Sequence, residues 1–422
     1  MHGRGRPCIH VFRSGAAFLR YDGRLMFSCR TDWKLAPNRF TNALDEARAP
    51  GSELIDLTIS NPTRAGLTYD SAAILDALKN PNSLEYDPQP KGLLRAREAV
   101  AAYYRDHGEA VDPEKLLLTT GTSEAYSFVF RLLASPGDEI LVAKPSYPLF
   151  DFLADLQDVK LVPYSLIYDH GWQIDFHTLE QAVTEKSRAI VLVHPNNPSG
   201  SYVSPPERER LNELCRKHNL ALLVDEVFLD YAHDGSHAQS FAGNNEALTF
   251  TLSGISKISA LPQMKLGWIA VTGPGAHVKP ALDRLEVIAD TYLSVSAPVQ
   301  WAASTFVEQR KSIQAQLVAR IHKNLVGLDH RLAAQRLCSR LQVEGGWYAV
   351  LRVPVTHSDD ELAISLLQHK RVIVHPGHFY DFPQEGYLVL SLIAEEDHFD
   401  EGVQRLLNFF GDTELPLSDQ QR

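Results

Sequence analysis

From about Glu53 onward the chain alternates short apolar runs with longer amphipathic stretches, and this alternation constrains its fold most. Runs this short and this rich in Val, Ile and Leu are typical of strands buried on both faces of a sheet. Strands that alternate with helices favour a parallel or mostly parallel sheet. We therefore predict an α/β fold with strands at residues 116–119, 139–143, 189–193, 220–224, 248–252 and 268–271.

A different pattern follows the last of these strands. Residues 297–335 form a long helical stretch, with Val299, Ala302 and Phe306 on one face. A shorter mixture of strands and helices comes after it, which predicts a smaller α+β domain. We expect helices at 123–133 and 206–218 in the first region, and in the last region strands at 347–351, 372–375 and 387–392 with helices at 359–369 and 399–409.

The composition is that of an ordinary globular protein. Of 422 residues, 44% are hydrophobic and 22% are charged, which excludes collagen, coiled coil and a disordered chain. The 41 basic and 52 acidic residues give a net charge of −11, without a basic block that would attract nucleic acid. No apolar run approaches the roughly 18 residues that a membrane span needs. We therefore expect neither a nucleic-acid nor a membrane partner.

The first 25 residues differ from the rest, since they carry five arginines and a single acid. Their longest apolar stretch, residues 16–19, is too short for the core of a secretory signal peptide. We interpret residues 1–25 as a disordered extension or an over-read start, with Met26 as the true start; a transit peptide is the alternative. The cysteines are scattered without zinc spacing, which predicts free thiols, no metal site and a reducing, cytoplasmic location: Cys8, Cys29, Cys215 and Cys338.

Polar residues gather in the turns that follow the strands. Ligands of open α/β sheets bind outside the carboxyl ends of the strands, so these turns form the candidate site. Each turn alone also fits ordinary loop chemistry, and only their combination is informative. The turns are residues 120–124, 145–148, 194–200, 225–226 and 253–257.

The first three turns offer ways to hold a ligand. Gly121 and Thr122 stand where the free N–H groups of a helix start attract an anion, although Glu124 also fits an ordinary first-turn acid. Tyr147 lies between two prolines, so its ring is presented rigidly for stacking or simply covers the end of the sheet. Asn197 offers a donor and an acceptor, in a turn that its Pro and Gly neighbours would explain by themselves.

The last two turns carry the reactive groups. Asp225 ends a buried strand, where a carboxylate is costly unless a ligand, a salt bridge or a helix cap pairs with it. Lys257 follows a strand between small residues, and burial would make its amine nucleophilic, whereas an open loop would leave it solvated. Together the five turns suit a planar, phosphorylated, nitrogen-bearing aldehyde bound as a Schiff base, because its protonated ring acts as an electron sink.

At this point the chain resembles the class I/II aminotransferases of the fold-type-I pyridoxal-phosphate superfamily, over roughly residues 56–407. The resemblance implies a large domain with a mostly parallel seven-stranded sheet and a smaller α+β domain. It also implies pyridoxal 5'-phosphate as the cofactor, an amino acid and a 2-oxo acid as substrates, and a homodimer with shared active sites. The motifs that carry it are Tyr86 with Gly92 and residues 94–95, then residues 120–122, 145–148, 197–200, 225–227, 256–257 and 376–377 with Phe379.

The resemblance also implies a division of the chain and a role for each matched residue. Lys257 would form the Schiff base and shuttle the proton at the substrate Cα, Asp225 would pair with the ring nitrogen, and Asn197 would bond the phenolic oxygen. The other implied cofactor contacts are Tyr147 and Val227 on the two ring faces, Gly121, Thr122 and Lys265 at the phosphate, Ser256 beside Lys257, and Tyr86 at the phosphate of the partner subunit. The expected parts are residues 1–25 (the extension), 26–65 (a segment joining the small domain), 66–300 (the large cofactor-binding domain) and 301–422 (the small C-terminal domain).

The sequence departs from the family pattern at three positions. Phe228 replaces a tyrosine that also bonds the phenolic oxygen, and Lys265 replaces an arginine at the phosphate. The alternative is that Phe228 only packs against the sheet and that a water or Tyr231 supplies the missing bond. Val389 stands where the family has the arginine that clamps the substrate carboxylate. We therefore expect the substrate contacts elsewhere, at Ser60, Asn197, Arg64 and His378.

Three classes of function remain to be weighed. The first is an aminotransferase that moves an amino group between an amino acid and a 2-oxo acid with ping-pong kinetics. The alternative on the same scaffold is a C–S lyase or a decarboxylase, which the sequence separates poorly from the first. A cofactor-sensing regulator is disfavoured, because too few residues precede Glu53 for a winged helix-turn-helix domain.

Overall fold

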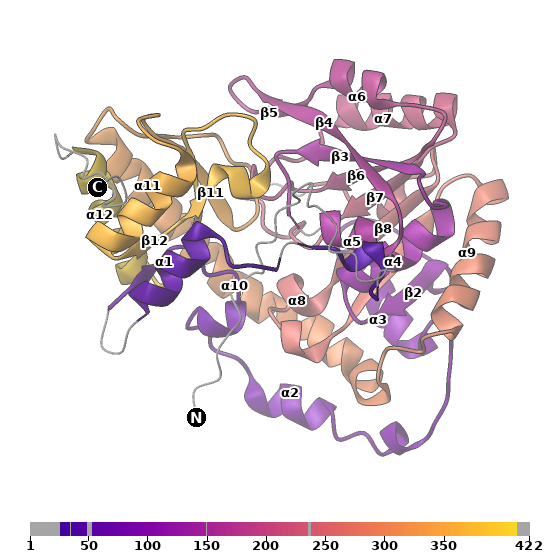
Figure 1. Cartoon of the computed structure of the whole chain (residues 1–422). Helices are drawn as coiled ribbons and strands as arrows, with labels where there is room; N and C mark the ends of the chain where they lie inside the picture. The colour runs from indigo at the N-terminus through magenta and orange to yellow at the C-terminus, as the bar shows by residue number, and fades with distance from the viewer. Residues whose placement is uncertain (1–25, 34, 49–52, 149, 235–237, 412–422) are drawn as a thin grey trace.

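The computed structural model of the chain describes residues 26–33, 35–48, 53–148, 150–234 and 238–411. The expected N-terminal extension lies outside these residues. Two lobes lie side by side, and the long helix α10 (Ala297–Ala333) contributes to the cores of both (Figure 1). Within the described ranges, no helix is long and apolar enough to cross a membrane.

The larger lobe is built on one sheet of eight strands, in the order β2–β9–β8–β7–β6–β3–β4–β5. Strands β8, β7, β6, β3 and β4 run parallel, whereas β9 is antiparallel to both of its neighbours and β5 is antiparallel to β4. The strands are β2 (Leu116–Thr119), β3 (Glu139–Lys144), β4 (Lys160–Tyr168), β5 (Trp172–Ile174), β6 (Ser187–Val193), β7 (Ala221–Asp225), β8 (Thr249–Gly254) and β9 (Gly267–Thr272).

The strands predicted from the apolar runs are all present, each within two residues of its expected ends. The sheet has one strand more than the seven expected, because the chain turns back after β4 into the short β5. Most residues of β4 are exposed or half-buried, since it lies next to the edge of the sheet. It therefore lacks the apolar run that revealed the central strands.

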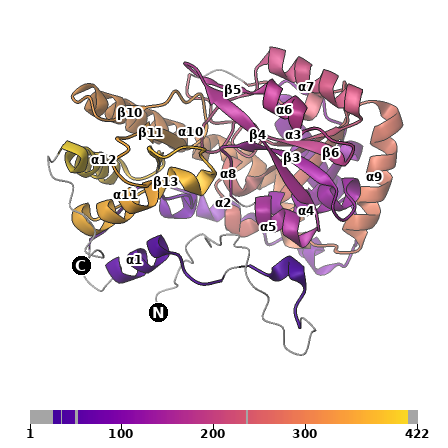
Figure 2. The same ribbon diagram turned by 45° about the horizontal axis from the view of Figure 1, so that its top comes forward.

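Helices cover both faces of the sheet (Figure 2). Leu223 of β7 packs in a core shared with α4, α5 and α9, whereas Leu222 and Val224 pack in a core shared with α6 and α7. This alternation is the one that a strand buried on both faces requires. The helices of this lobe are α2 (Ser71–Ala77), α3 (Leu94–Asp106), α4 (Thr122–Leu133), α5 (Phe150–Leu156), α6 (Phe176–Ala182), α7 (Pro205–His218), α8 (Ile255–Ile258) and α9 (Gly275–Asp290).

The smaller lobe holds an antiparallel sheet, β10–β11–β14–β13, and a parallel pair, β1–β12. The N-terminal segment belongs to it, because Ser391 donates through N to the Leu57 carbonyl (2.7 Å) and through Oγ to the Ile59 carbonyl (2.5 Å). This packing supports, as a proposal, the assignment of residues 26–65 to the smaller lobe. The proposed boundary between residues 66–300 and 301–422 falls inside α10, whose first turns pack in the core of the larger lobe. The elements are α1 (Arg39–Ala47), β1 (Ile55–Asp56), β10 (Ser339–Arg340), β11 (Tyr348–Arg352), α11 (Asp359–Ser365), β12 (Val372–Ile373), β13 (His375–Pro376), β14 (Tyr387–Ser391) and α12 (Glu396–Gly411).

Candidate active site

The five polar turns meet at one edge of the large sheet. β3, β6, β7 and β8 run parallel, so the residues that follow them emerge on the same side. β2 shares this direction, because it and β8 both pair antiparallel with β9. The smaller lobe reaches the same edge through the turn after β13, where the Tyr380 carbonyl accepts the N–H of Ser146 at 2.9 Å. The candidate site therefore lies where the two lobes meet.

Asp225 is the last residue of β7, and its side chain is buried. Its Oδ1 accepts the backbone N–H of Val227 at 3.1 Å. Burial raises the pKa of this carboxyl group to about 6. The Val227 N–H, the Tyr126 hydroxyl and the Lys257 charge each lower this pKa, but burial has the larger effect. A carboxylate in this position costs free energy unless a cationic ligand compensates it.

Lys257 lies in α8, directly after β8, and is half-buried. Its Nζ donates to the carbonyl oxygen of Ser60 at 3.3 Å. The Nζ also lies over two aromatic rings, 5.0 Å from the centroid of Trp347 and 5.7 Å from that of Phe228. Three distant segments of the chain thus enclose this lysine, which distinguishes it from a solvated loop lysine.

Asn197 is buried, and its Oδ1 has no hydrogen-bond partner among the residues that the structure describes. A buried amide oxygen without a partner costs free energy until a ligand or water donates to it. Tyr147, in contrast, is 40% exposed, and Val227 next to Asp225 is half-buried. The open amide oxygen therefore indicates that a polar group of a ligand belongs at Asn197.

The start of α4 provides a place for an anion. No described side chain caps this helix, whose N-cap is Gly121 and whose first residue is Thr122. Glu124 lies in the first turn of α4, and its Oε2 accepts the N–H of Thr120 at 2.8 Å. This contact fits the alternative interpretation of Glu124 as an ordinary first-turn acid. Lys265 Nζ lies 3.7 Å from the position that a Cβ would take on Gly121. Free N–H groups beside a lysine favour a phosphate or a similar anion.

The predicted substrate residues are only partly brought together. Ser60 touches Lys257 through its carbonyl, and His378 is half-buried in the turn Gly377–Tyr380. Arg64 is exposed at the end of the turn Pro62–Arg64, within five residues of Ser60. Val389 is fully buried in β14, opposite Val350 of β11 and His375 of β13. The usual position of the carboxylate arginine is thus part of an apolar core.

The remaining predicted cofactor contacts, Ser256 and Tyr86, differ in burial. Ser256 is half-buried beside Lys257, as its place in α8 requires. Tyr86 is 81% exposed, so its ring adds little to the site of its own chain. A solvent-facing tyrosine is available to a neighbouring subunit instead.

Sequence reasoning missed the site roles of Trp347 and Tyr126, and it considered Tyr231 only as an alternative donor to the phenolic oxygen. Trp347 is fully buried directly before β11, and its ring packs edge-to-face against Phe228 at 5.2 Å. Tyr231 donates its hydroxyl to the backbone carbonyl of Lys257 at 2.7 Å. These contacts join residues that are 26 or more positions apart in the sequence, so no local sequence pattern predicts them.

The site can therefore hold a flat, anionic ligand that carries a ring nitrogen and a reactive carbonyl carbon. Asp225 offers a counter-charge to the nitrogen, α4 and Lys265 attract the anionic group, and Lys257 offers the amine. This donor set defines an enzyme site in which a lysine nucleophile works opposite a buried acid. The residues present fit such a group, because the Asn197 Oδ1 has no hydrogen-bond partner within the described ranges, burial raises the pKa of the Asp225 carboxyl, and no described side chain caps α4.

Comparison with known proteins agrees with this class of site. The family described as aminotransferase class I and II matches residues 52–406. The glutamate-pyruvate aminotransferase AlaA of Haemophilus influenzae is 26% identical, over 86% of this chain and 92% of that protein. The arginine–pyruvate transaminase AruH of Pseudomonas aeruginosa is 29% identical, over 84% of this chain and 90% of that protein.

Solved structures show the same fold. An aminotransferase from Escherichia coli superimposes with a TM-score of 0.79 at 25% identity, covering 88% of this chain and 94% of that one. Because the family match spans most of the sequence, the chain belongs to the class I and II aminotransferases and is a transaminase.

Proposed function

We propose that this enzyme moves an amino group between an amino acid and a 2-oxo acid, with pyridoxal 5'-phosphate attached to Lys257. The observation that carries the proposal is the pairing of a buried Asp225 carboxyl, whose pKa is raised to about 6, with a lysine at the same edge of the sheet. The names of the relatives favour transamination over the lyase and decarboxylase alternatives.

Each part of the cofactor would meet a residue suited to it. Asp225 would hold the ring nitrogen protonated, and Asn197 would bond the phenolic oxygen through its side chain. Gly121, Thr122 and Lys265 would hold the phosphate, while Tyr147 and Val227 would lie against the ring. When bound, the protonated ring accepts the electron pair left on the substrate Cα, which is the chemistry that the protein itself lacks.

The side chains of the protein would then handle the protons and exclude water. Lys257 Nζ would move the proton at the substrate Cα, guided by the rings of Trp347 and Phe228 that lie beside it. Ser256 precedes this lysine in the same turn of α8. The two lobes meet over the site at Ser146 and Tyr380, so the lobe contact shields these transfers from solvent.

Arg64 is our candidate for the substrate carboxylate, supported by the Ser60 carbonyl and by His378. The guanidinium of Arg64 has no ion pair or side-chain hydrogen bond within the described residues, although the loop that carries it touches Lys257 at Ser60. By analogy with the named relatives, we propose pyruvate-like 2-oxo acids as acceptors. Asn197 would also lie close to the carboxylate.

We propose further that the enzyme is a homodimer with shared active sites, in which Tyr86 reaches the phosphate of the partner subunit. The exposure of Leu84 (93%) and Tyr86 (81%) supports an interface at this segment. The described cysteines Cys29, Cys215 and Cys338 are free thiols, which supports a reducing, cytoplasmic location.

A half-reaction assay tests the proposed function. The purified protein, loaded with pyridoxal 5'-phosphate, is mixed with single amino acids such as glutamate, alanine or arginine, without any 2-oxo acid. We expect stoichiometric pyridoxamine phosphate and the matching 2-oxo acid with at least one donor. Ammonia, a thiol or carbon dioxide released without pyridoxamine phosphate would instead establish the lyase or decarboxylase alternative.

A further inference from the structure

We propose that Tyr231 is a positioning residue, which holds the backbone of Lys257 at a fixed place relative to Asp225. Tyr231 is fully buried, and its hydroxyl donates to the Lys257 carbonyl at 2.7 Å. A tyrosine hydroxyl has one hydrogen to donate, so this bond leaves none for a ligand. The inference rests on the proposed function, because it concerns the lysine assigned to the cofactor.

The helix that carries Lys257 needs such support because it is very short. α8 spans only Ile255–Ile258, so few backbone bonds hold it: the Lys257 carbonyl accepts the Ala260 N–H at 3.2 Å, and the Ile255 carbonyl accepts the N–H groups of Ser259 and Leu261. Three side chains from different parts of the chain add bonds to the carbonyls of α8 and of the turn that follows it. Tyr231 donates to Lys257, Gln314 of α10 donates to Ile258 at 2.9 Å, and Tyr69 donates to Ala260 at 3.0 Å.

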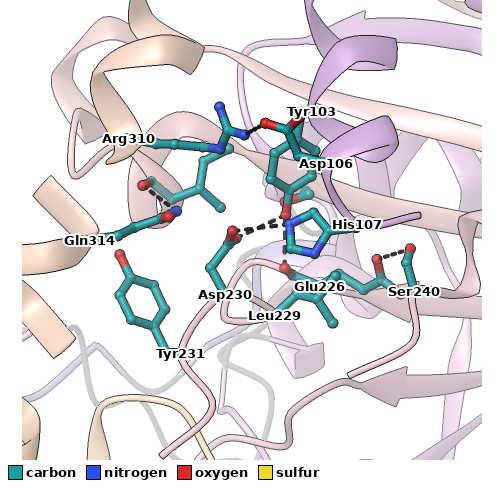
Figure 3. Close-up of polar contacts among 12 residues, drawn as sticks. Tyr103, Asp106, His107, Glu226, Leu229, Asp230, Tyr231, Ser240, Arg310 and Gln314 are labelled. Atoms are coloured by element: carbon teal, nitrogen blue, oxygen red, sulfur yellow. Dashed lines mark hydrogen bonds and ion pairs between the residues drawn. The ribbon is translucent and has the colours of Figure 1, made fainter. Parts of the chain in front are cut away.

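Tyr231 can act as a fixed support because the segment that leads to it from Asp225 is itself anchored. Figure 3 shows Tyr103 and His107, both from the α3 region, converging on Asp230. The Tyr103 hydroxyl donates to Asp230 Oδ2 at 2.9 Å, and His107 Nε2 lies 3.1 Å from Oδ1. Asp230 directly precedes Tyr231, so these bonds limit how far its ring can move.

The other end of the segment is anchored as firmly. Glu226 is fully buried and accepts both the Ser240 hydroxyl (2.7 Å) and the Phe241 N–H (2.6 Å). Residues 225–231 thus run between two buried anchors, with the cofactor acid at one end and the lysine clamp at the other. The spacing between Asp225 and Lys257 is therefore set by this segment and not by α8 alone.

The consequence is chemical. Attachment of a carbonyl carbon to Nζ and proton transfer at the substrate Cα both need the amine within a few tenths of an ångström of its place. Without the Tyr231 hydroxyl, the Lys257 carbonyl keeps only the longer bond from the Ala260 N–H (3.2 Å), and α8 can shift. We expect slower chemistry with little change in substrate binding, since Tyr231 is fully buried and its hydroxyl is bonded to the Lys257 carbonyl.

The test compares Tyr231→Phe with a matched control, Tyr164→Phe. The Tyr164 hydroxyl is also buried and also donates to a backbone carbonyl, that of Val191 at 3.0 Å, but away from the lysine turn. Two quantities are measured on each protein: the rate at which the apoprotein takes up pyridoxal 5'-phosphate covalently, trapped with borohydride, and kcat against KM. Tyr69→Phe, which removes a second bond to the same turn, serves if Tyr231→Phe does not fold.

We expect Tyr231→Phe to lower both the uptake rate and kcat by roughly tenfold, with KM within about twofold of the wild type. Tyr69→Phe should act in the same direction, and Tyr164→Phe should change neither quantity. Equal losses in Tyr231→Phe and Tyr164→Phe would overturn the inference, as would wild-type uptake and kcat in Tyr231→Phe or, in its place, Tyr69→Phe. If the wild type itself takes up no cofactor at Lys257, the proposed function fails and the inference with it.

Discussion

His107 Nε2 lies 3.1 Å from Asp230 Oδ1, and this pair is largely shielded from solvent behind the active-site segment. Burial alone would lower the pKa of His107, but the hydrogen bond and charge of Asp230, with Glu226 further off, outweigh it, and the pKa is raised. Arg310 opposes this rise from the side of α10. The histidine is therefore charged in the folded protein at a pH where it is neutral in the unfolded chain.

The first prediction follows from the sign of this shift. A histidine with a raised pKa stabilises the folded state fully below its unfolded pKa of about 6.5, and the stabilisation is lost as the pH rises through the folded pKa. The variant His107→Gln should thus melt roughly 2–6 °C below the wild type at pH 6, with a gap that narrows by pH 9. Melting curves of the two apoproteins measure it; a gap that stays constant over this range contradicts the account.

The second prediction concerns Asp225 and the cofactor. Its folded pKa of about 6 lies above the ordinary value of 3.8, so in the apoprotein its contribution to stability is present below about pH 4 and lost as the pH rises through about 6. This difference corresponds to about 3 kcal/mol. A cationic ring nitrogen offsets the loss, so pyridoxal 5'-phosphate should raise the melting temperature more at pH 7.5 than at pH 5.

The variant Asp225→Asn provides the control, since it has no carboxylate to compensate. The cofactor should raise the melting temperature of this variant by a similar amount at both pH values. The titration of free pyridoxal 5'-phosphate affects both proteins equally, so the difference between the two proteins isolates the effect of Asp225. The variant should also lose several kcal/mol of transition-state stabilisation, roughly tenfold in rate for each 1.4 kcal/mol. Near-normal turnover would refute the assigned role.

The third prediction identifies the attachment point. Borohydride reduction of the loaded enzyme, followed by peptide mapping, should place the label on Lys257 and on no other lysine. Lys257→Ala should carry no label, whereas Lys265→Ala should keep the label on Lys257 and bind the cofactor roughly tenfold more weakly, because only the charge near Gly121 is lost. Label on another lysine in Lys257→Ala would sink the assignment.

The fourth prediction concerns the substrate carboxylate. A charge-assisted hydrogen bond is worth about 1.5–3 kcal/mol, so Arg64→Ala should raise KM by roughly tenfold or more. Arg336→Ala removes another exposed arginine, just beyond the end of α10, and should leave KM unchanged. His378→Ala is measured alongside. If neither Arg64→Ala nor His378→Ala changes KM, backbone groups or another residue must hold the carboxylate.

The fifth prediction concerns Phe228, which is buried against Trp347. A donor to the cofactor's phenolic oxygen stabilises the phenolate, and this makes proton loss from the nitrogen that joins Lys257 to the cofactor easier. Because Phe228 offers none and the Tyr231 hydroxyl is already bonded to Lys257, Phe228→Tyr should lower the pH midpoint of the bound cofactor's absorbance change. Phe228→Leu should not lower it. A midpoint that does not fall in Phe228→Tyr means that another donor already occupies the place.

Most of the sheet and of the site frame could be predicted from the sequence. Central strands such as β7 consist of apolar runs, and parallel strands bring their following turns to one edge, so Asp225 and Lys257 were expected at one site. The strand β4 was missed because its half-exposed residues show no apolar run. Local sequence patterns thus predict which residues form a strand or helix and which residues follow its end.

Contacts between distant segments were beyond such patterns. Trp347 directly precedes β11 in the other lobe, and nothing in the sequence around it indicates that its ring centroid lies 5.0 Å from Lys257 Nζ. The bond from Tyr231 to Lys257 likewise depends on how the chain packs after Asp225, and not on spacing. The clamp on α8 could therefore be seen only in three dimensions.

The bond from Lys257 Nζ to the Ser60 carbonyl makes the larger lobe an incomplete enzyme. The segment that provides Ser60 is fastened to Ser391 of the smaller lobe on both sides, through the carbonyls of Leu57 and Ile59. A chain without residues 1–65, or a chimaera that exchanges only the smaller lobe, would keep every residue at the edge of the large sheet. Either change would still alter the surroundings of the Lys257 amine. The segment with Ser60, β14 and α8 are therefore linked through these bonds around the reactive amine.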